Sequence, residues 1–113
     1  MTKNLDSEGL RSIAENYDLF YIDLWGVMHN GIKLHKDAIY TLKKLSEINK
    51  NFVLLTNAPR PIYPVKEFLE KMGMEEKFRN KVFTSGEAAL NYLRNFYPLK
   101  KFYHIGPPRD FDL

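Results

Sequence analysis

Small polar residues follow the apolar segments of this chain, at positions where a ligand could be held. An acid, Asp23, interrupts the first apolar run. Hydroxyl and amide side chains follow the next two runs, as Thr56 and Asn57 and then as Thr84 and Ser85. One carboxylate near several such groups, most of them just before a helix, is typical of a phosphate site, because free helix amides favour anions. Each residue alone is more often a turn former or a helix cap, so only the joint placement indicates a site.

The apolar runs predict strands of one parallel sheet. Leu19 to Ile22 indicates a strand buried on both faces, and Asn51 to Leu55 a second strand. Val82 and Phe83 predict the core of a brief third strand, and Lys101 to Ile105 a fourth strand that ends at Gly106. Parallel strands share one carboxyl edge, where ligands collect, so the polar groups above are expected to meet there.

Helical patterns separate the strands. The segment from Leu34 to Lys50 repeats apolar residues every three or four positions, which predicts an amphipathic helix. A second helix has Pro64 in its first turn and ends at Gly73. A capping-box spacing at Thr84 and Glu87 starts a third helix, which runs to about Tyr97. The apolar residues expected to face inward on the second and third helices are Val65, Phe68, Leu69, Met72, Ala89, Leu90, Leu93 and Phe96.

The order of these elements predicts an α/β fold with right-handed crossovers between neighbouring strands. A short helix over Ser7 to Asn16 is expected to precede the first strand and cover a sheet edge. The 113 residues suffice for one domain, and 44% hydrophobic with 27% charged residues is an ordinary globular balance.

Composition also bears on partners. The net charge of +3 comes from dispersed lysines and arginines, with no basic stripe, so nucleic-acid binding is not expected. The chain has no cysteine, which is compatible with a reducing cytoplasm. No apolar run approaches the ~20 residues of a membrane helix. We therefore expect a cytoplasmic protein without membrane association.

Four segments together resemble one enzyme family. DLWGVMHNG, which begins at Asp23, is similar to the first motif of the haloacid dehalogenase superfamily of phosphohydrolases, which reads Asp, any residue, Asp, Gly, Val. LLTNAPRP resembles the second motif, and FTSGEAAL and HIGPPRDFDL resemble segments of the class IIA members. The similarity is greatest to a class IIA subgroup with Trp in place of the second Asp. It implies a Rossmann-like three-layer parallel sheet.

The resemblance also implies roles for individual residues. Asp23 would attack phosphorus and form an aspartyl-phosphate. Magnesium would bridge the Asp23 carboxylate and the phosphate, with the backbone carbonyl of Trp25 as a second metal ligand. Thr56 would donate a hydrogen bond to the phosphoryl oxygens of a small phosphorylated substrate, with Asn57 beside it.

The chain departs from the family pattern at Trp25, which stands where family members carry a general acid/base. The loss of such a group commonly costs ~10²–10⁴ in rate. One hypothesis is that His29 replaces it. Another is that the leaving group needs no proton.

A second departure concerns completeness. The family core continues through a cap domain, a phosphate-binding lysine and further acidic magnesium ligands, and Asp110 and Asp112 do not correspond to those acids. Residues 1–113 therefore correspond to the amino-terminal part of the core, without the cap domain and the carboxyl-terminal half. We expect an incomplete sheet and little or no turnover. The alternatives are a non-catalytic remnant or interaction module, and one half of a split enzyme that requires a complementing polypeptide.

Overall fold

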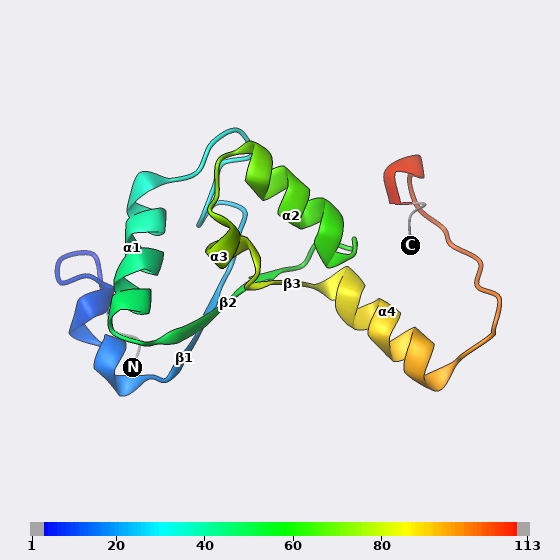
Figure 1. Ribbon diagram of the computed structural model, residues 1–113, viewed down its shortest axis with the longest axis horizontal. Coiled ribbons are helices and arrows are strands. Elements are labelled where there is room, and N and C mark those ends of the chain that lie inside the picture. The colour runs from blue at the N-terminus through cyan, green and yellow to red at the C-terminus, as the bar shows by residue number, and fades with distance from the viewer. Residues whose placement is uncertain (1–3, 111–113) are drawn as a thin grey trace.

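The computed structural model describes residues 4–110, and these form an α/β fold (Figure 1). The class predicted from the sequence is confirmed. Strands and α-helices alternate along the chain, and 3-10 turns lie near both ends of the described region. In chain order the elements are η1 (Leu10–Ser12), η2 (Ala14–Asn16), β1 (Leu19–Ile22), α1 (Lys36–Glu47), β2 (Asn51–Thr56), α2 (Ile62–Lys71), α3 (Glu76–Arg79), β3 (Val82–Thr84), α4 (Ser85–Phe96) and η3 (Pro108–Asp110).

The sheet of the described residues is parallel, with strand order β1-β2-β3. Phe20 lies opposite Phe52 in the register, and Leu54 lies opposite Val82. Because neighbours in the chain are also neighbours in the sheet, the connecting helices lie on one side of it. Figure 1 shows α1, α2 and α3 gathered on that side.

Two helices end in the same hydrogen-bonded cap. After α1, Asn49 adopts a left-handed conformation with φ 58°, and the amide of Lys50 donates to the carbonyl of Leu45. After α2, Gly73 adopts φ 90° and the amide of Met74 donates to the carbonyl of Leu69. These are Schellman motifs, which satisfy the last carbonyls of a helix. The helix end predicted at Gly73 is confirmed.

The core lies between the sheet and these helices. Helix α3 was not anticipated from the sequence, although its Phe78 is almost fully buried and lies 6.1 Å from Phe52 between ring centroids. The buried apolar residues of this core are Leu24, Met28, Leu42, Leu45, Phe52, Leu54, Leu69, Met74, Phe78 and Val82.

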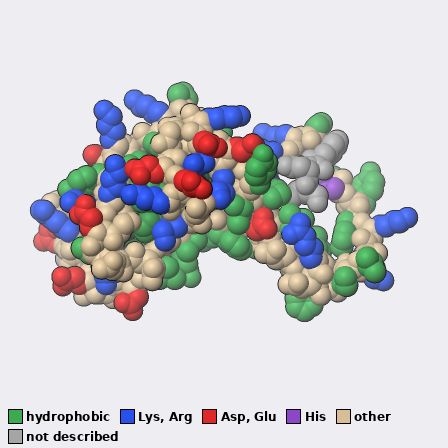
Figure 2. Space-filling view, in the orientation of Figure 1, with side chains coloured by type: hydrophobic (Ala, Val, Ile, Leu, Met, Phe, Trp, Pro, Cys, Tyr) green, Lys and Arg blue, Asp and Glu red, His purple; other side chains and the backbone are tan. Residues whose placement is uncertain are grey.

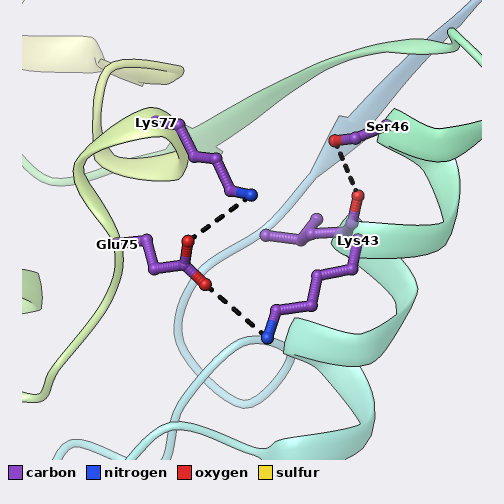
Figure 3. Close-up of polar contacts among 5 residues, drawn as sticks. Lys43, Ser46, Glu75 and Lys77 are labelled. Atoms are coloured by element: carbon purple, nitrogen blue, oxygen red, sulfur yellow. Dashed lines mark hydrogen bonds and ion pairs between the residues drawn. The ribbon is translucent and has the colours of Figure 1, made fainter.

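An ion-pair cluster joins the outer surfaces of α1 and α3. The Glu75 carboxylate lies between Lys43, at 3.6 Å, and Lys77, at 3.4 Å (Figure 3). All three side chains are about half exposed, so each pair contributes no more than about 1 kcal/mol. The apolar core therefore determines how these helices pack.

The other face of the sheet is exposed. Leu19, Tyr21, Leu55 and Phe83 point to this face, and Tyr21 is 71% exposed. The predicted burial of Leu19 to Ile22 on both faces is therefore wrong, because the described helices cover a single face. In Figure 2 hydrophobic side chains gather along the lower middle of the view, beside the strands of Figure 1. We call the surface of these four residues the open face.

The carboxyl-terminal third departs most from the sequence-based expectation. Residues 101–105 form no strand, because they run as an exposed segment that pairs with none of the strands in residues 4–110. Helix α4 exists, but Ala89 and Phe96 are exposed and Leu90 and Leu93 only half-buried, so its predicted burial is wrong. The described chain has a radius of gyration of 16.5 Å, against about 13 Å for a compact domain of this length.

The amino-terminal helix predicted over Ser7 to Asn16 is also corrected. The structure has two 3-10 turns there, η1 and η2, of which only Ala14 is buried. Gly9, with φ 73°, precedes the first turn and breaks any longer helix. Among residues 4–110, no helix combines the length and hydropathy needed to cross a membrane.

The open face predicts opposite outcomes for two adjacent leucines of β2. Leu54 is 0% exposed and Leu55 is 41% exposed. We expect Leu54→Ala to lower the free energy of unfolding by about 2–5 kcal/mol, because it leaves a cavity in the core. Leu55→Ala should cost less than about 1 kcal/mol. Urea unfolding of the two variants measures both values, and an equal loss at Leu55 would show that its face is covered in solution.

Candidate active site

Asp23 follows β1 directly and begins a loop that is folded around one atom. The carbonyl oxygen of Leu24 accepts hydrogen bonds from the amides of Val27, Met28 and His29, at 3.3, 2.8 and 3.2 Å. Leu24 and Met28 are buried in the core, which anchors the loop from below. The Asp23 carboxylate accepts a hydrogen bond from the Leu24 amide at 2.9 Å. The side chain of Asp23 is exposed to solvent.

A second loop, residues 56–61, follows β2 and is held by the start of α4. The Gly86 amide donates to the carbonyl of Ala58 at 3.0 Å, and the Thr84 hydroxyl donates to the carbonyl of Arg60 at 2.6 Å. The Glu87 carboxylate accepts the Ile62 amide at 3.0 Å, at the first residue of α2. These contacts fix the loop against β3 and α4.

Three of the predicted site residues meet at one cavity. Asp23, Thr56 and Asn57 line a cavity of about 380 Å³, together with Tyr21, Leu55 and Ser85. All lie at or just beyond the carboxyl ends of β1 to β3, as the parallel topology requires. The Thr56 side chain is largely buried, and its hydroxyl oxygen accepts the Ala58 amide at 3.2 Å.

Thr84 and Gly106 do not join this cavity. The Thr84 side chain is fully buried, donates to Arg60 and caps α4 by accepting the Glu87 amide at 2.9 Å. The capping function predicted for Thr84 is thus confirmed, and its hydroxyl is committed to the structure. Gly106 lies in the exposed carboxyl-terminal segment, far along the chain from any described strand. Phe111 to Leu113, the end of the fourth similar segment, lie outside the described residues.

A larger cavity, of about 540 Å³, adjoins the first and shares Thr56 and Asn57 with it. Trp25, the fourth predicted site residue, lines this second cavity together with His29 and the first half of α2. Asp23 thus lines one cavity and Trp25 the other, while Thr56 and Asn57 line both.

His29 is built into the loop rather than poised for proton transfer. It is almost fully buried, and its Nδ1 accepts the Gly31 amide at 3.0 Å. Burial, with a smaller contribution from nearby His35, lowers the pKa of His29, and the negative charge of Asp23 partly offsets this. A neutral ring whose Nδ1 accepts carries its proton on Nε2, so it offers neither a free lone pair nor an extra proton.

Positive charge reaches the second cavity through residues that the sequence analysis did not select. Arg60 and Arg109 both line it. Arg60 lies four residues after Thr56 in the same loop, and that proximity was the signal available in the sequence. A guanidinium group offers several donors to a phosphate and keeps its charge at all working pH values.

The residues present suit part of a magnesium site. Among residues 4–110 no three His, Asp or Glu side chains cluster closely enough to hold a metal ion. Within the same range Asp23 accepts one hydrogen bond, from Leu24, which leaves its second oxygen open to a ligand. Magnesium is commonly held by one or two carboxylates plus phosphate and water, so a single carboxylate and a carbonyl at Trp25 fit such a site incompletely.

A cavity larger than these two lies elsewhere. It measures about 860 Å³ and separates α4 from the carboxyl-terminal segment. Neither Asp23 nor Thr56 lines it, and its walls are mainly apolar or aromatic. We therefore place the candidate site at the two smaller cavities.

The low pKa of His29 predicts a pH-dependent stability. The unfolded chain binds a proton at His29 as the pH falls below about 6.5 and the folded chain resists it, so stability is complete above that value and falls below it. His29→Asn keeps an acceptor for the Gly31 amide but cannot titrate. Between about pH 7.5 and about pH 5.5, the melting temperature of the wild type should fall by more than that of His29→Asn.

The control for this pH dependence is His104→Asn, in the exposed carboxyl-terminal segment, which should behave as the wild type does. If His29→Asn and the wild type lost the same melting temperature on acidification, His29 would not be the responsible group.

At Gly86, replacement by alanine is expected to destabilise the protein, although Gly→Ala usually stabilises a helix. A Cβ at this position would lie 2.3 Å from the carbonyl oxygen of Arg60, so the Thr56 loop would have to move. Gly→Ala within a helix ordinarily stabilises by up to about 1 kcal/mol. Here we expect Gly86→Ala to destabilise by about 1–3 kcal/mol because of overpacking. Urea unfolding tests this against Ser85→Ala, the neighbouring change, and a stabilised Gly86→Ala would contradict the close approach.

The chain is similar to one protein family and to several solved structures. Residues 20–112 match the family model described as haloacid dehalogenase-like hydrolase. No curated protein matched the chain. Among solved structures, a haloacid dehalogenase-like hydrolase from Brucella suis 1330 superposes with a TM-score of 0.76 at 30% identity, over 89% of this chain and 36% of that one.

Two further structures are similar. A protein described as nagD has a TM-score of 0.62 at 27% identity, over 72% of this chain and 32% of its own. The hypothetical protein PH1952 from Pyrococcus horikoshii OT3 has a TM-score of 0.57 at 25% identity, over 71% of this chain and 31% of its own. The chain thus spans about a third of the length of these structures. The match to the family model over most of the sequence shows that the chain belongs to the haloacid dehalogenase-like hydrolases.

Proposed function

We propose that this chain carries the nucleophile and phosphoryl-binding loops of a magnesium-dependent phosphohydrolase. The observation that carries the proposal is the shared cavity of Asp23, Thr56 and Asn57 at the carboxyl edge of the sheet, in a chain that belongs to a hydrolase family. The substrate class is a small phosphate monoester.

In this proposal Asp23 attacks phosphorus with the carboxylate oxygen that Leu24 does not occupy. The oxygen–phosphorus bond to Asp23 forms as the bond to the leaving oxygen breaks, and water later hydrolyses the aspartyl-phosphate. The Thr56 hydroxyl, which accepts the Ala58 amide, keeps its own proton for a phosphoryl oxygen. Asn57 adds an amide donor from the same loop.

A magnesium ion held by the Asp23 carboxylate and the Trp25 carbonyl would supply positive charge against the phosphate. Arg60 and Arg109 support the same role from the adjoining cavity. Electrostatic stabilisation of this kind is usually a large part of phosphoryl-transfer catalysis, so its strength limits the rate.

The proposal predicts a ligand-dependent melting temperature. Magnesium with fluoroberyllate, a phosphoryl mimic that binds an aspartate, should raise the melting temperature of the full chain, because it binds only the folded state. Asp23→Asn should abolish the increase. Asp18→Asn, a matched change at the opposite end of β1, should retain it. An increase that survives Asp23→Asn would contradict the assigned nucleophile.

A second proposal is that a complementing polypeptide completes the site. It is supported by the apolar open face, which the described helices leave uncovered. In that case the chain alone hydrolyses phenyl phosphate with magnesium slowly or not at all. Rapid turnover by the purified chain, lost in Asp23→Asn, would contradict the need for a second polypeptide.

A further inference from the structure

Trp25 is exposed and yet held in place. Its side chain is 62% exposed, although large aromatic residues are normally mostly buried. The ring packs directly over Gly31, where a Cβ would lie 2.3 Å from the indole. On another side the ring centroid lies 4.9 Å from that of His29, in an edge-to-face arrangement. His29 is in turn packed edge-to-face against Phe68 of α2 at 5.6 Å. The indole therefore forms a wall that contacts with Gly31 and His29 hold on two sides.

This wall bounds the 540 Å³ cavity beside the proposed phosphoryl site. Apolar side chains of α2, namely Pro64, Val65 and Phe68, line the same cavity. Thr56 and Asn57 belong to both cavities, so a phosphoryl group beside Asp23 would direct its leaving group toward Trp25. Apolar walls with one exposed aromatic face suit a flat apolar group.

The chemistry of position 25 agrees with this geometry. An indole cannot donate a proton to a leaving oxygen, and the Nδ1 of His29 already accepts a hydrogen bond from the Gly31 amide. An aliphatic alcohol, with a pKa near the ~16 of water, needs such a donor. A phenol, with a pKa of about 10, leaves readily as its anion.

We infer that Trp25 is a specificity-determining residue that stacks on a planar aromatic leaving group, so that the substrate is a phosphate ester of an aromatic alcohol. The inference rests on the proposed function and names its substrate class. As the bond from Asp23 to phosphorus forms, the bond from phosphorus to the aryl oxygen breaks. Its electron pair leaves with the aryl oxygen, which takes a proton from water afterwards.

The chain contains one tryptophan, so its fluorescence reports on this site directly. The full chain with magnesium is titrated with phenyl phosphate and, in parallel, with glycerol 2-phosphate. We expect phenyl phosphate to change the Trp25 emission and to bind about tenfold more tightly, the ratio that one aromatic stacking contact provides. Equal affinity for the two esters, measured by calorimetry, would overturn the inference.

A variant series separates stacking from folding. Trp25→Leu keeps the backbone carbonyl and an apolar side chain, and should reduce the calorimetric preference for phenyl phosphate to near unity. Trp25→Phe should restore part of it. Tyr92→Leu, a matched loss of an exposed aromatic residue on α4, should leave the preference unchanged. A preference that persists in Trp25→Leu would overturn the inference.

The thermal melt with fluoroberyllate distinguishes the proposed phosphohydrolase function from the proposed aromatic substrate class. If fluoroberyllate raises the melting temperature through Asp23 but phenyl phosphate has no advantage, the substrate class is wrong and the phosphohydrolase function stands. If neither fluoroberyllate nor either ester binds, both proposals are wrong.

Discussion

The carbonyl oxygen of Leu24 accepts three backbone amides, and the placement of the candidate site depends on it. Those bonds turn the chain sharply after β1, while the buried side chains of Leu24 and Met28 fasten the turn to the core. Asp23 is thereby left at the sheet edge and Trp25 two residues further along the rim. Gly26 adopts φ 78° in this turn, a conformation that glycine tolerates because it has no Cβ. Its amide donates a hydrogen bond to the carbonyl of His29 at 2.8 Å. The Asp23 carboxylate is thus positioned by backbone hydrogen bonds and by buried apolar side chains.

The loop after β2 is held by contacts from another part of the chain. It is held by Thr84, the last residue of β3, and by Gly86 and Glu87 in the first turn of α4, which contact the loop or the first residue of α2. Helix α4 is otherwise mostly exposed, so its main contribution to the described fold is at its first turn. This explains why a helix that buries little apolar surface still matters for the site, since its amino-terminal turn sets the position of the Thr56 loop.

Features that depend on a few neighbouring residues were predicted from the sequence, and features that depend on distant parts of the chain were not. The periodicity of α1, the stop at Gly73 and the cap at Thr84 each depend on a few neighbouring residues, so the sequence was enough. The strand expected at Lys101 to Ile105 requires a partner strand, and none of the described strands lies beside it. The burial of Leu19 and Tyr21 likewise depends on a covering layer that no local pattern reports.

The candidate site was likewise predictable only in part. Asp23, Thr56 and Asn57 were placed together by the rule that parallel strands share a carboxyl edge. The cavity beside Trp25 is lined by the first loop, the second loop and α2 together, and Arg60 is one of its lining residues. Thr84 was expected at the edge as well, but its hydroxyl is used within the fold, which a residue type alone does not reveal.

The open face has a thermodynamic consequence. The heat capacity change of unfolding follows the apolar surface that water gains, and Leu19, Tyr21, Leu55 and Phe83 are already 36% to 71% exposed before unfolding begins. The change per residue is therefore smaller than the ~12–15 cal/mol/K of an ordinary domain. A smaller change flattens the dependence of stability on temperature. The chain thus has a shallow stability curve, on which cooling gains little and the loss on heating is gradual.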